Sequence, residues 1–88
     1  MTRTIWKFPL KITDYQEIRA PSPKILHVAT QHDEPCLWVE VTPGCAPRTI
    51  GIYIHGTGHI LSEDCGDYIG TVLTHHDALV WHVYEAIR

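Results

Sequence analysis

Seven short apolar runs, each bounded by turn-forming residues, constrain this chain more than any other feature of its sequence. Their apolar residues recur at every second position or form brief β-branched stretches, which is typical of strands and not of helices. Clusters of Pro, Gly, Asp, His and Ser separate the runs. We expect strands at residues 5–10, 17–20, 24–31, 36–42, 48–55, 68–74 and 79–85.

The pattern leaves little room for helices. The one weak candidate is a single turn over residues 13–18, with Thr13 or Asp14 as its cap. Parallel strands need long crossover connections, which a chain of 88 residues with seven strands does not offer. The sequence therefore predicts an all-β fold, a small antiparallel sandwich or partly open barrel of about seven short strands, with residues 1–88 as one β domain.

Composition limits the kinds of partner. With 44% hydrophobic and 19% charged residues, the chain is typical of a folded protein. The seven Lys and Arg residues are scattered and the net charge is -3, which excludes the dense cationic surface needed for duplex nucleic acid. Small chains expose much of their surface and often gain stability from self-association, so we expect a homo-oligomer.

The cysteines and the apolar runs indicate the cellular compartment in which the protein is expected. Three cysteines, Cys36, Cys45 and Cys65, cannot all pair within one chain, and residues 1–7 lack the apolar core of a signal peptide. Reduced thiols in the cytoplasm of a host cell are the expectation. No apolar run approaches the roughly 20 residues needed to span a bilayer, so we expect no integral membrane segment.

Alternation along the strands separates two sets of side chains. The aliphatic set should face the core: Leu37, Val39, Val41, Ile50, Ile52 and Ile54. The opposite faces carry aromatic or imidazole groups: Trp38, Tyr53, His55, His82 and Tyr84. Such groups combine contact area with hydrogen-bonding tips, which is typical of an interface or a ligand site. The alternative is a second half of the core, with the polar tips satisfied.

A glycine turn, Gly56-Thr57-Gly58-His59, directly follows the strand expected at residues 48–55. Glycine allows a ligand to approach the main-chain N–H groups, and Thr57, His55 and His59 add polar atoms around the turn. No helix follows, which excludes the Walker loop and the dinucleotide fingerprint. The turn is either a simple tight connection or a nest for a phosphate or ribose.

No metal or cofactor is expected. The closest histidine groupings are His55 with His59 and His75 with His76, and neither has the spacing of a known ligand pattern, even with Cys65 and Asp67 nearby.

No catalytic residue is expected either. The acidic neighbours Glu63, Asp64 and Asp67 should raise the pKa of the Cys65 thiol, which disfavours a thiolate enzyme. Ser62 lacks a nucleophile elbow.

Several motifs together resemble a family of short phage, prophage and bacterial proteins classed as a domain of unknown function. They are residues 5–10 (IWKFPL), 12–14 (ITD), 35–38 (PCLW), 56–59 (GTGH), 68–71 (YIGT) and 79–83 (LVWHV). The resemblance covers nearly the whole chain and implies a phage or host-defence context. In size and character the chain is also similar to small phage sponges, non-enzymatic oligomers that sequester nucleotide second messengers of antiphage immunity.

Three hypotheses follow, and the first is a homo-oligomeric, non-enzymatic protein that sequesters a nucleotide-like small molecule. Its expected ligand contacts are Trp38, Tyr53, His55, Gly56, Thr57, Gly58, His59, His82, Tyr84 and Arg48, with Lys24 as a second candidate for neutralising phosphate. The second is an interaction module whose aromatic face docks a host or phage protein. The third is a small phosphodiesterase for a cyclic nucleotide, with His55 and His59 as acid and base.

Overall fold

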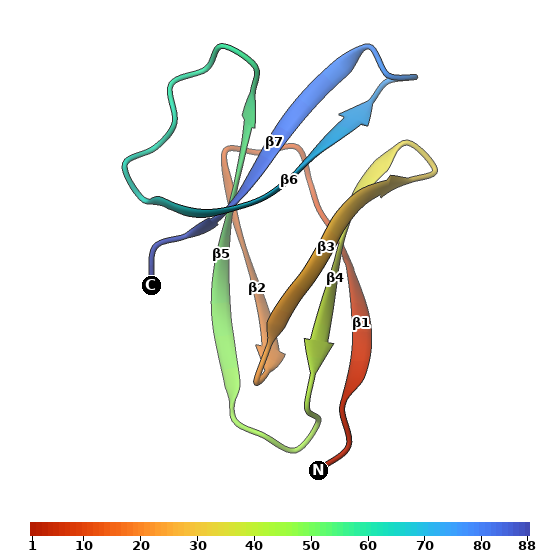
Figure 1. Ribbon diagram of the computed structural model, residues 1–88, viewed down its shortest axis with the longest axis vertical. Coiled ribbons are helices and arrows are strands. Elements are labelled where there is room, and N and C mark those ends of the chain that lie inside the picture. Colours follow the sequence, from red (N-terminus) through yellow and green to blue (C-terminus); the bar gives the residue numbers. More distant parts are fainter.

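The computed structural model describes residues 1–88 and contains seven strands and no helix, which confirms the all-β prediction (Figure 1). The strands are β1 (Thr4–Pro9), β2 (Tyr15–Pro21), β3 (Lys24–Gln31), β4 (Glu34–Val41), β5 (Pro47–Gly56), β6 (Cys65–Thr74) and β7 (Leu79–Ala86). The weak candidate for a helical turn over residues 13–18 does not form, because Tyr15 already pairs with β5 and Ile18 enters the core at strand periodicity. No helix is available to cross a membrane.

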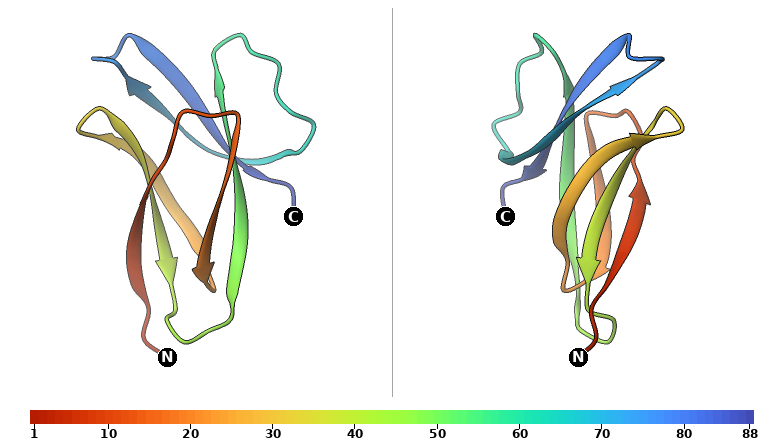
Figure 2. Two further views of the ribbon diagram at one scale, coloured as in Figure 1. Left: turned by 180° about the vertical axis from the view of Figure 1, so that it is seen from behind. Right: turned by 45° about the vertical axis from the view of Figure 1, so that its right-hand side comes forward.

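The strands form two antiparallel sheets. Sheet A has the order β1-β4-β3, and sheet B has the order β2-β5-β7-β6. The sheets face each other, and β3 lies against β6 where they meet (Figures 1 and 2). Both sheets remain open at their edges, so the fold is a sandwich and not a closed barrel.

The core lies between the sheets, as alternation predicts. On β4 and β5 the inward set is buried: Leu37, Val39, Val41, Ile50, Ile52 and Ile54. The outer faces of the two sheets point in opposite directions, because each sheet turns its aliphatic side toward the other. Trp38 on β4 is therefore on the outside of sheet A, whereas Tyr53 and His55 on β5 are on the outside of sheet B.

The two-residue turn between β3 and β4 is tied to the hairpin end of β6 and β7. Its residues His32 and Asp33 have φ values of 52° and 63°. The Asp33 carboxylate accepts the backbone N–H of His75 at 3.0 Å and that of His76 at 3.2 Å. Figure 2 shows both hairpin ends on the same side of the sandwich. This contact joins the sheets at the end opposite the N-terminus.

Candidate functional site

The outer face of sheet B carries all four tyrosines of the chain in one row across its strands. Tyr15 on β2 pairs with Tyr53 on β5, Tyr53 pairs with Tyr84 on β7, and Tyr84 pairs with Tyr68 on β6. The ring centroids of Tyr15 and Tyr53 are 4.8 Å apart, and those of Tyr68 and Tyr84 are 5.4 Å apart. We call these residues the tyrosine row. Sequence reasoning missed Tyr15 and Tyr68, because only the strand order aligns them with the other two.

Two histidines lie beside the tyrosine row, directly opposite each other on neighbouring strands. His55 on β5 pairs with His82 on β7. The His55 ring stacks on Tyr53, with centroids 5.9 Å apart and planes 8° from parallel. His55 is only 8% exposed, and its Nε2 is the one buried side-chain nitrogen or oxygen without a hydrogen-bond partner. An unpaired buried polar atom costs about 1–3 kcal/mol, so this nitrogen is a strong candidate for contact with a ligand.

The ring of His82, in contrast, is held at both nitrogens. Its Nε2 lies 2.8 Å from Thr57 Oγ1, and its Nδ1 lies 3.0 Å from Thr71 Oγ1. The Thr71 hydroxyl also contacts the phenol oxygen of Tyr68. These contacts fix the orientation of the imidazole and connect the glycine turn, through His82, to the tyrosine row.

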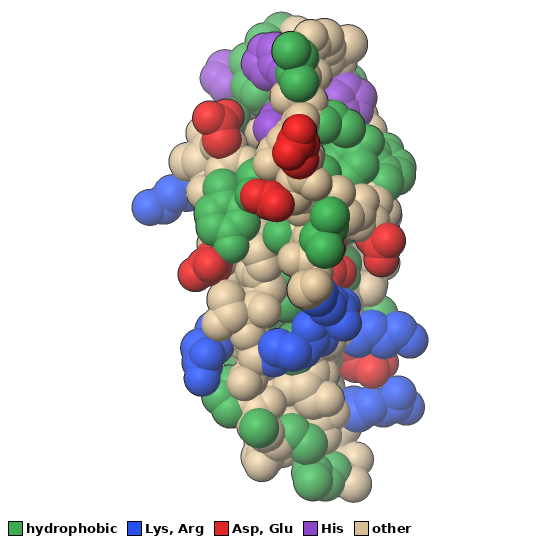
Figure 3. Space-filling view, turned by 90° about the vertical axis from the view of Figure 1, so that its left-hand side faces the viewer, with side chains coloured by type: hydrophobic (Ala, Val, Ile, Leu, Met, Phe, Trp, Pro, Cys, Tyr) green, Lys and Arg blue, Asp and Glu red, His purple; other side chains and the backbone are tan.

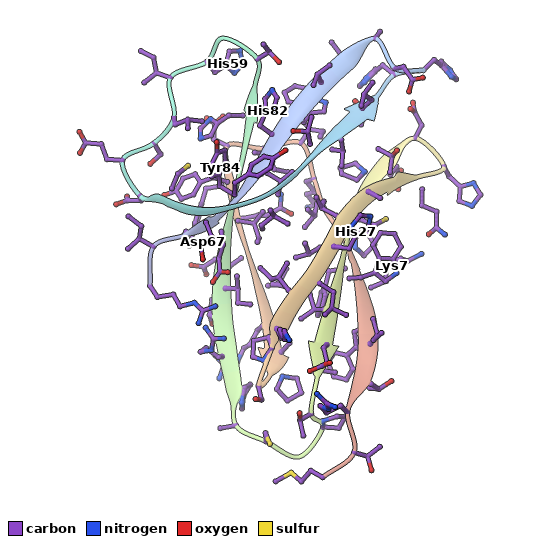
Figure 4. All side chains as sticks on the ribbon, in the orientation of Figure 1. Lys7, His27, His59, Asp67, His82 and Tyr84 are labelled. Carbon is purple, nitrogen blue, oxygen red and sulfur yellow. The ribbon has the colours of Figure 1, made fainter.

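Residues 57–64 connect β5 to β6 and form a segment that we call the strap. Figures 1 and 4 show the strap standing off the outer side of sheet B, and Figure 4 places His82 and Tyr84 on that same side. One end is attached through Thr57 to His82, and at the other end the Asp64 carbonyl accepts the N–H of Ile87 at 2.8 Å. Between these ends, Ile60 is 92% exposed.

The glycine turn at the start of the strap is closed by His59. The Gly56 N–H donates to His59 Nδ1 at 3.2 Å, and the His59 N–H donates to the Gly56 carbonyl at 3.1 Å. A Cβ at position 56 would lie 2.9 Å from the His59 ring, so glycine is needed for this close approach. Gly58 has a φ of 88°, which favours glycine for its backbone conformation. His59 therefore caps the turn and does not pair with His55.

Acidic groups lie around the middle of this face. Tyr15 donates its hydroxyl hydrogen to Glu17 Oε2 at 2.7 Å, and this hydrogen bond is the main cause that raises the pKa of Tyr15. Burial and the nearby charges of Glu17 and Asp64 raise the same pKa further. Figure 3 shows histidines at the top of this side of the molecule, acidic side chains in the middle and basic side chains below.

The Glu17→Gln substitution is expected to lower the pKa of Tyr15, because the amide removes the negative charge that disfavours tyrosinate. The stabilising contribution of this hydrogen bond is present below about pH 10 and is lost as pH rises through the raised folded-state pKa. Ultraviolet absorbance of tyrosinate, followed through a pH titration, compares the Tyr15 pKa in Glu17→Gln with that in the original protein. Glu34→Gln on sheet A serves as the control, and an unchanged Tyr15 titration in Glu17→Gln would contradict the assignment.

Three residues expected to contact the ligand lie away from the histidine pair. Trp38 is on the outer face of sheet A, where its ring centroid lies 6.3 Å from that of His27. Lys7 on β1 is its register partner, and Figure 4 labels both His27 and Lys7. Arg48 lies near the opposite end of β5 and donates to the Pro23 carbonyl at 3.1 Å. Lys24 begins β3 on sheet A. Of the expected contacts, the structure thus gathers Tyr53, His55, His82, Tyr84 and the glycine turn at one place.

The thiol chemistry follows the expected direction. The pKa of the Cys65 thiol is raised, mainly by burial and further by Asp64, while a hydrogen bond from the Ser62 backbone partly lowers it. The predicted direction of the Cys65 pKa shift is confirmed, but its largest cause is burial, and of the three acidic neighbours only Asp64 contributes. No group of three or more His, Cys, Asp or Glu side chains is arranged to hold a metal ion.

One family model matches the chain, and it covers residues 1–88. That family is described as a domain of unknown function (DUF7352). No curated protein and no solved structure matches the chain.

Proposed function

We propose that this chain, which belongs to the DUF7352 family over its whole length, is a non-enzymatic protein that sequesters a nucleotide-like small molecule. The ligand would sit on the outer face of sheet B, beside the strap. The observation that carries the proposal is the buried, unpartnered Nε2 of His55 next to a row of aromatic rings. In its finer form, the ligand is a nucleotide-derived immune signal and the chain is a phage product that withholds it.

Aromatic stacking supports recognition of a heterocyclic base. The rings of Tyr53 and His55 lie nearly parallel on this face, with centroids 5.9 Å apart, and flat aromatic rings are the groups on which a heterocyclic base stacks. Stacking on an aromatic side chain contributes about 1–3 kcal/mol per base. A base also presents donors and acceptors at its edge, and one of these can satisfy His55 Nε2.

The charges near the site favour a ligand with few phosphates. Arg48 is too far along β5 to neutralise a phosphate near His55, and the strap itself carries Glu63 and Asp64. The backbone N–H groups of Gly58 and Ile60, however, donate to no protein acceptor. These free donors can bind one phosphate at the turn, as backbone nests do.

Self-association is part of the same proposal. Strand β1 is an edge strand of sheet A and has a free backbone edge. Its residues Ile5 and Trp6 are 57% and 41% exposed. Exposed apolar residues on an unpaired edge are suited to pairing with a second copy, so we propose a homo-oligomer assembled through β1.

The His55→Phe substitution tests the proposal. Phenylalanine keeps a flat ring on Tyr53 and removes the unpaired nitrogen, so ligand affinity is expected to fall by about tenfold or more while folding stability is unchanged or improved by about 1 kcal/mol. Native mass spectrometry of protein purified from cells identifies the ligand, and calorimetry with that ligand measures affinity. His27→Phe, a strand histidine on sheet A, is the matched control. Equal affinity in His55→Phe and the original protein would contradict the proposal.

The strand register favours a specific form of the phosphodiesterase alternative. His55 faces His82 across neighbouring strands, whereas His59 is folded back onto Gly56, so an acid and base pair would be His55 and His82. Recovery of a hydrolysed ligand, with turnover lost in His55→Phe, would support this enzyme.

The exposed Ile60 of the strap suits the other alternative, an interaction module that docks a protein. An oligomer that retains a polypeptide but no small molecule would favour this module.

A further inference from the structure

Thr57 has the contacts of an activated hydroxyl. Its Oγ1 lies 2.8 Å from His82 Nε2, and His82 Nδ1 lies 3.0 Å from Thr71 Oγ1. A hydroxyl next to an imidazole that a third group orients is the arrangement that activates nucleophiles for acyl transfer. We propose that Thr57 is a nucleophile that takes a short apolar acyl group from an activated ester, with His82 as general base and Thr71 as a positioning residue. This inference does not depend on the proposed ligand at His55.

The hydrogen-bond chain is consistent with His82 acting as a base toward Thr57. When Nε2 accepts the Thr57 hydroxyl hydrogen, the neutral ring carries its hydrogen on Nδ1 and donates it to Thr71 Oγ1. Thr71 then donates to the phenol oxygen of Tyr68, with which it is in contact. When His82 gains a second proton, both ring nitrogens donate and neither threonine needs to move. The same geometry therefore serves the imidazole before and after proton transfer.

Apolar residues beside Thr57 provide a place for the acyl chain. Thr57 and His59 line a cavity of about 320 Å³ whose other walls include Leu79, Val80 and Trp81. Thr57 is exposed, so a dissolved ester can approach its hydroxyl. This lining favours a short hydrocarbon chain over a charged group.

A donor for the developing oxyanion follows the nucleophile directly. The Gly58 N–H donates to no protein acceptor, and glycine at a φ of 88° leaves this amide without a flanking side chain. In nucleophile elbows, the backbone N–H of the residue after the nucleophile stabilises the oxyanion. Gly58 occupies the corresponding position after Thr57.

The chemical step needs no cofactor. Thr57 Oγ1 forms a bond to the ester carbonyl carbon while its proton passes to His82 Nε2. The carbonyl electrons move onto the oxygen, which accepts the Gly58 N–H. The carbonyl then reforms as the bond to the leaving alcohol oxygen breaks, and His82 returns the proton to that oxygen. The products are an acyl ester on Thr57 and a free alcohol.

The test uses the full chain and p-nitrophenyl butanoate. Release of p-nitrophenol gives the rate, and mass spectrometry of peptides locates the butanoyl group. We expect acylation at Thr57 with a rate that rises as imidazole loses its proton. Thr57→Val should abolish this labelling and Thr57→Ser should retain it, whereas Thr49→Val, a hydroxyl on the same sheet face, should have no effect.

The base and its orientation are tested separately. His82→Gln should lower the acylation rate by about a hundredfold and remove its pH dependence. Thr71→Val should shift the pH profile, and Thr71→Ser should restore it. Label found only on cysteines or lysines, or an unchanged rate in His82→Gln, would overturn the proposal. The two proposals fail separately, because His55→Phe removes the proposed ligand contact and keeps Thr57, His82 and Thr71.

Discussion

Replacing Ile52 with alanine is expected to lower the free energy of unfolding by about 3 kcal/mol. Ile52 is 0% exposed and lies on β5, which has β2 on one side and β7 on the other. Its side chain points into the core between the two sheets. Neighbouring strands are held by backbone hydrogen bonds and cannot close around the missing atoms, so a cavity remains. Urea denaturation followed by tryptophan fluorescence measures the change.

Ile60→Ala is the matched control, since the same atoms are removed from a side chain that is 92% exposed on the strap. Its free energy of unfolding should change by no more than about 0.5 kcal/mol. If Ile52→Ala and Ile60→Ala had similar small effects, Ile52 would not be at the centre of a packed core.

Replacing Gly70 with alanine is expected to destabilise the fold by about 2 kcal/mol. A Cβ at position 70 would lie 2.7 Å from Val28 Cγ1, at the place where β6 of sheet B lies against β3 of sheet A. Val28 is only 5% exposed and belongs to the core cluster, so it cannot turn away without opening other contacts. Relief of the clash requires Val28 or the adjoining backbone to shift at this junction of the two sheets.

A double-mutant cycle separates this clash from other effects of alanine. Val28→Ala alone removes core contacts and should also destabilise the protein. In the double variant the new methyl group of residue 70 occupies the space left by the Val28 side chain. The decrease in the free energy of unfolding should therefore be about 1 kcal/mol smaller than the sum of the decreases in the two single variants. Strictly additive losses would contradict the described contact between Gly70 and Val28.

The positions of the strands could be predicted from the sequence because their signals are local. Alternating side chains and turn residues act within a few positions of each other, and the aliphatic sets of β4 and β5 were assigned to the core correctly. The predictions failed where the local pattern is irregular. β6 begins at Cys65 and not at Tyr68, because register shifts near Tyr68 interrupt its alternation. β2 includes Tyr15, whose polar neighbours indicated a turn.

The candidate site could be predicted only in part. His55, the glycine turn and Tyr53 are contiguous in the chain, so one strand and its connection bring them together. Their relation to His82 depends on the pairing of β5 with β7, two strands separated by the strap and β6. The contact between Thr57 and His82, which underlies the proposed nucleophile, is likewise a consequence of that pairing.

The fold class, the number of strands and the apolar side of each central strand follow from local sequence, since strand periodicity and turn chemistry depend on neighbouring residues. Which outer faces coincide depends on how distant strands pair. Trp38 and Tyr53 have equivalent positions in the alternation of their strands, yet they lie on opposite sides of the sandwich. Alternation along a strand determines whether a side chain faces the core or the outside. Its neighbours on the outer face depend on which distant strands pair.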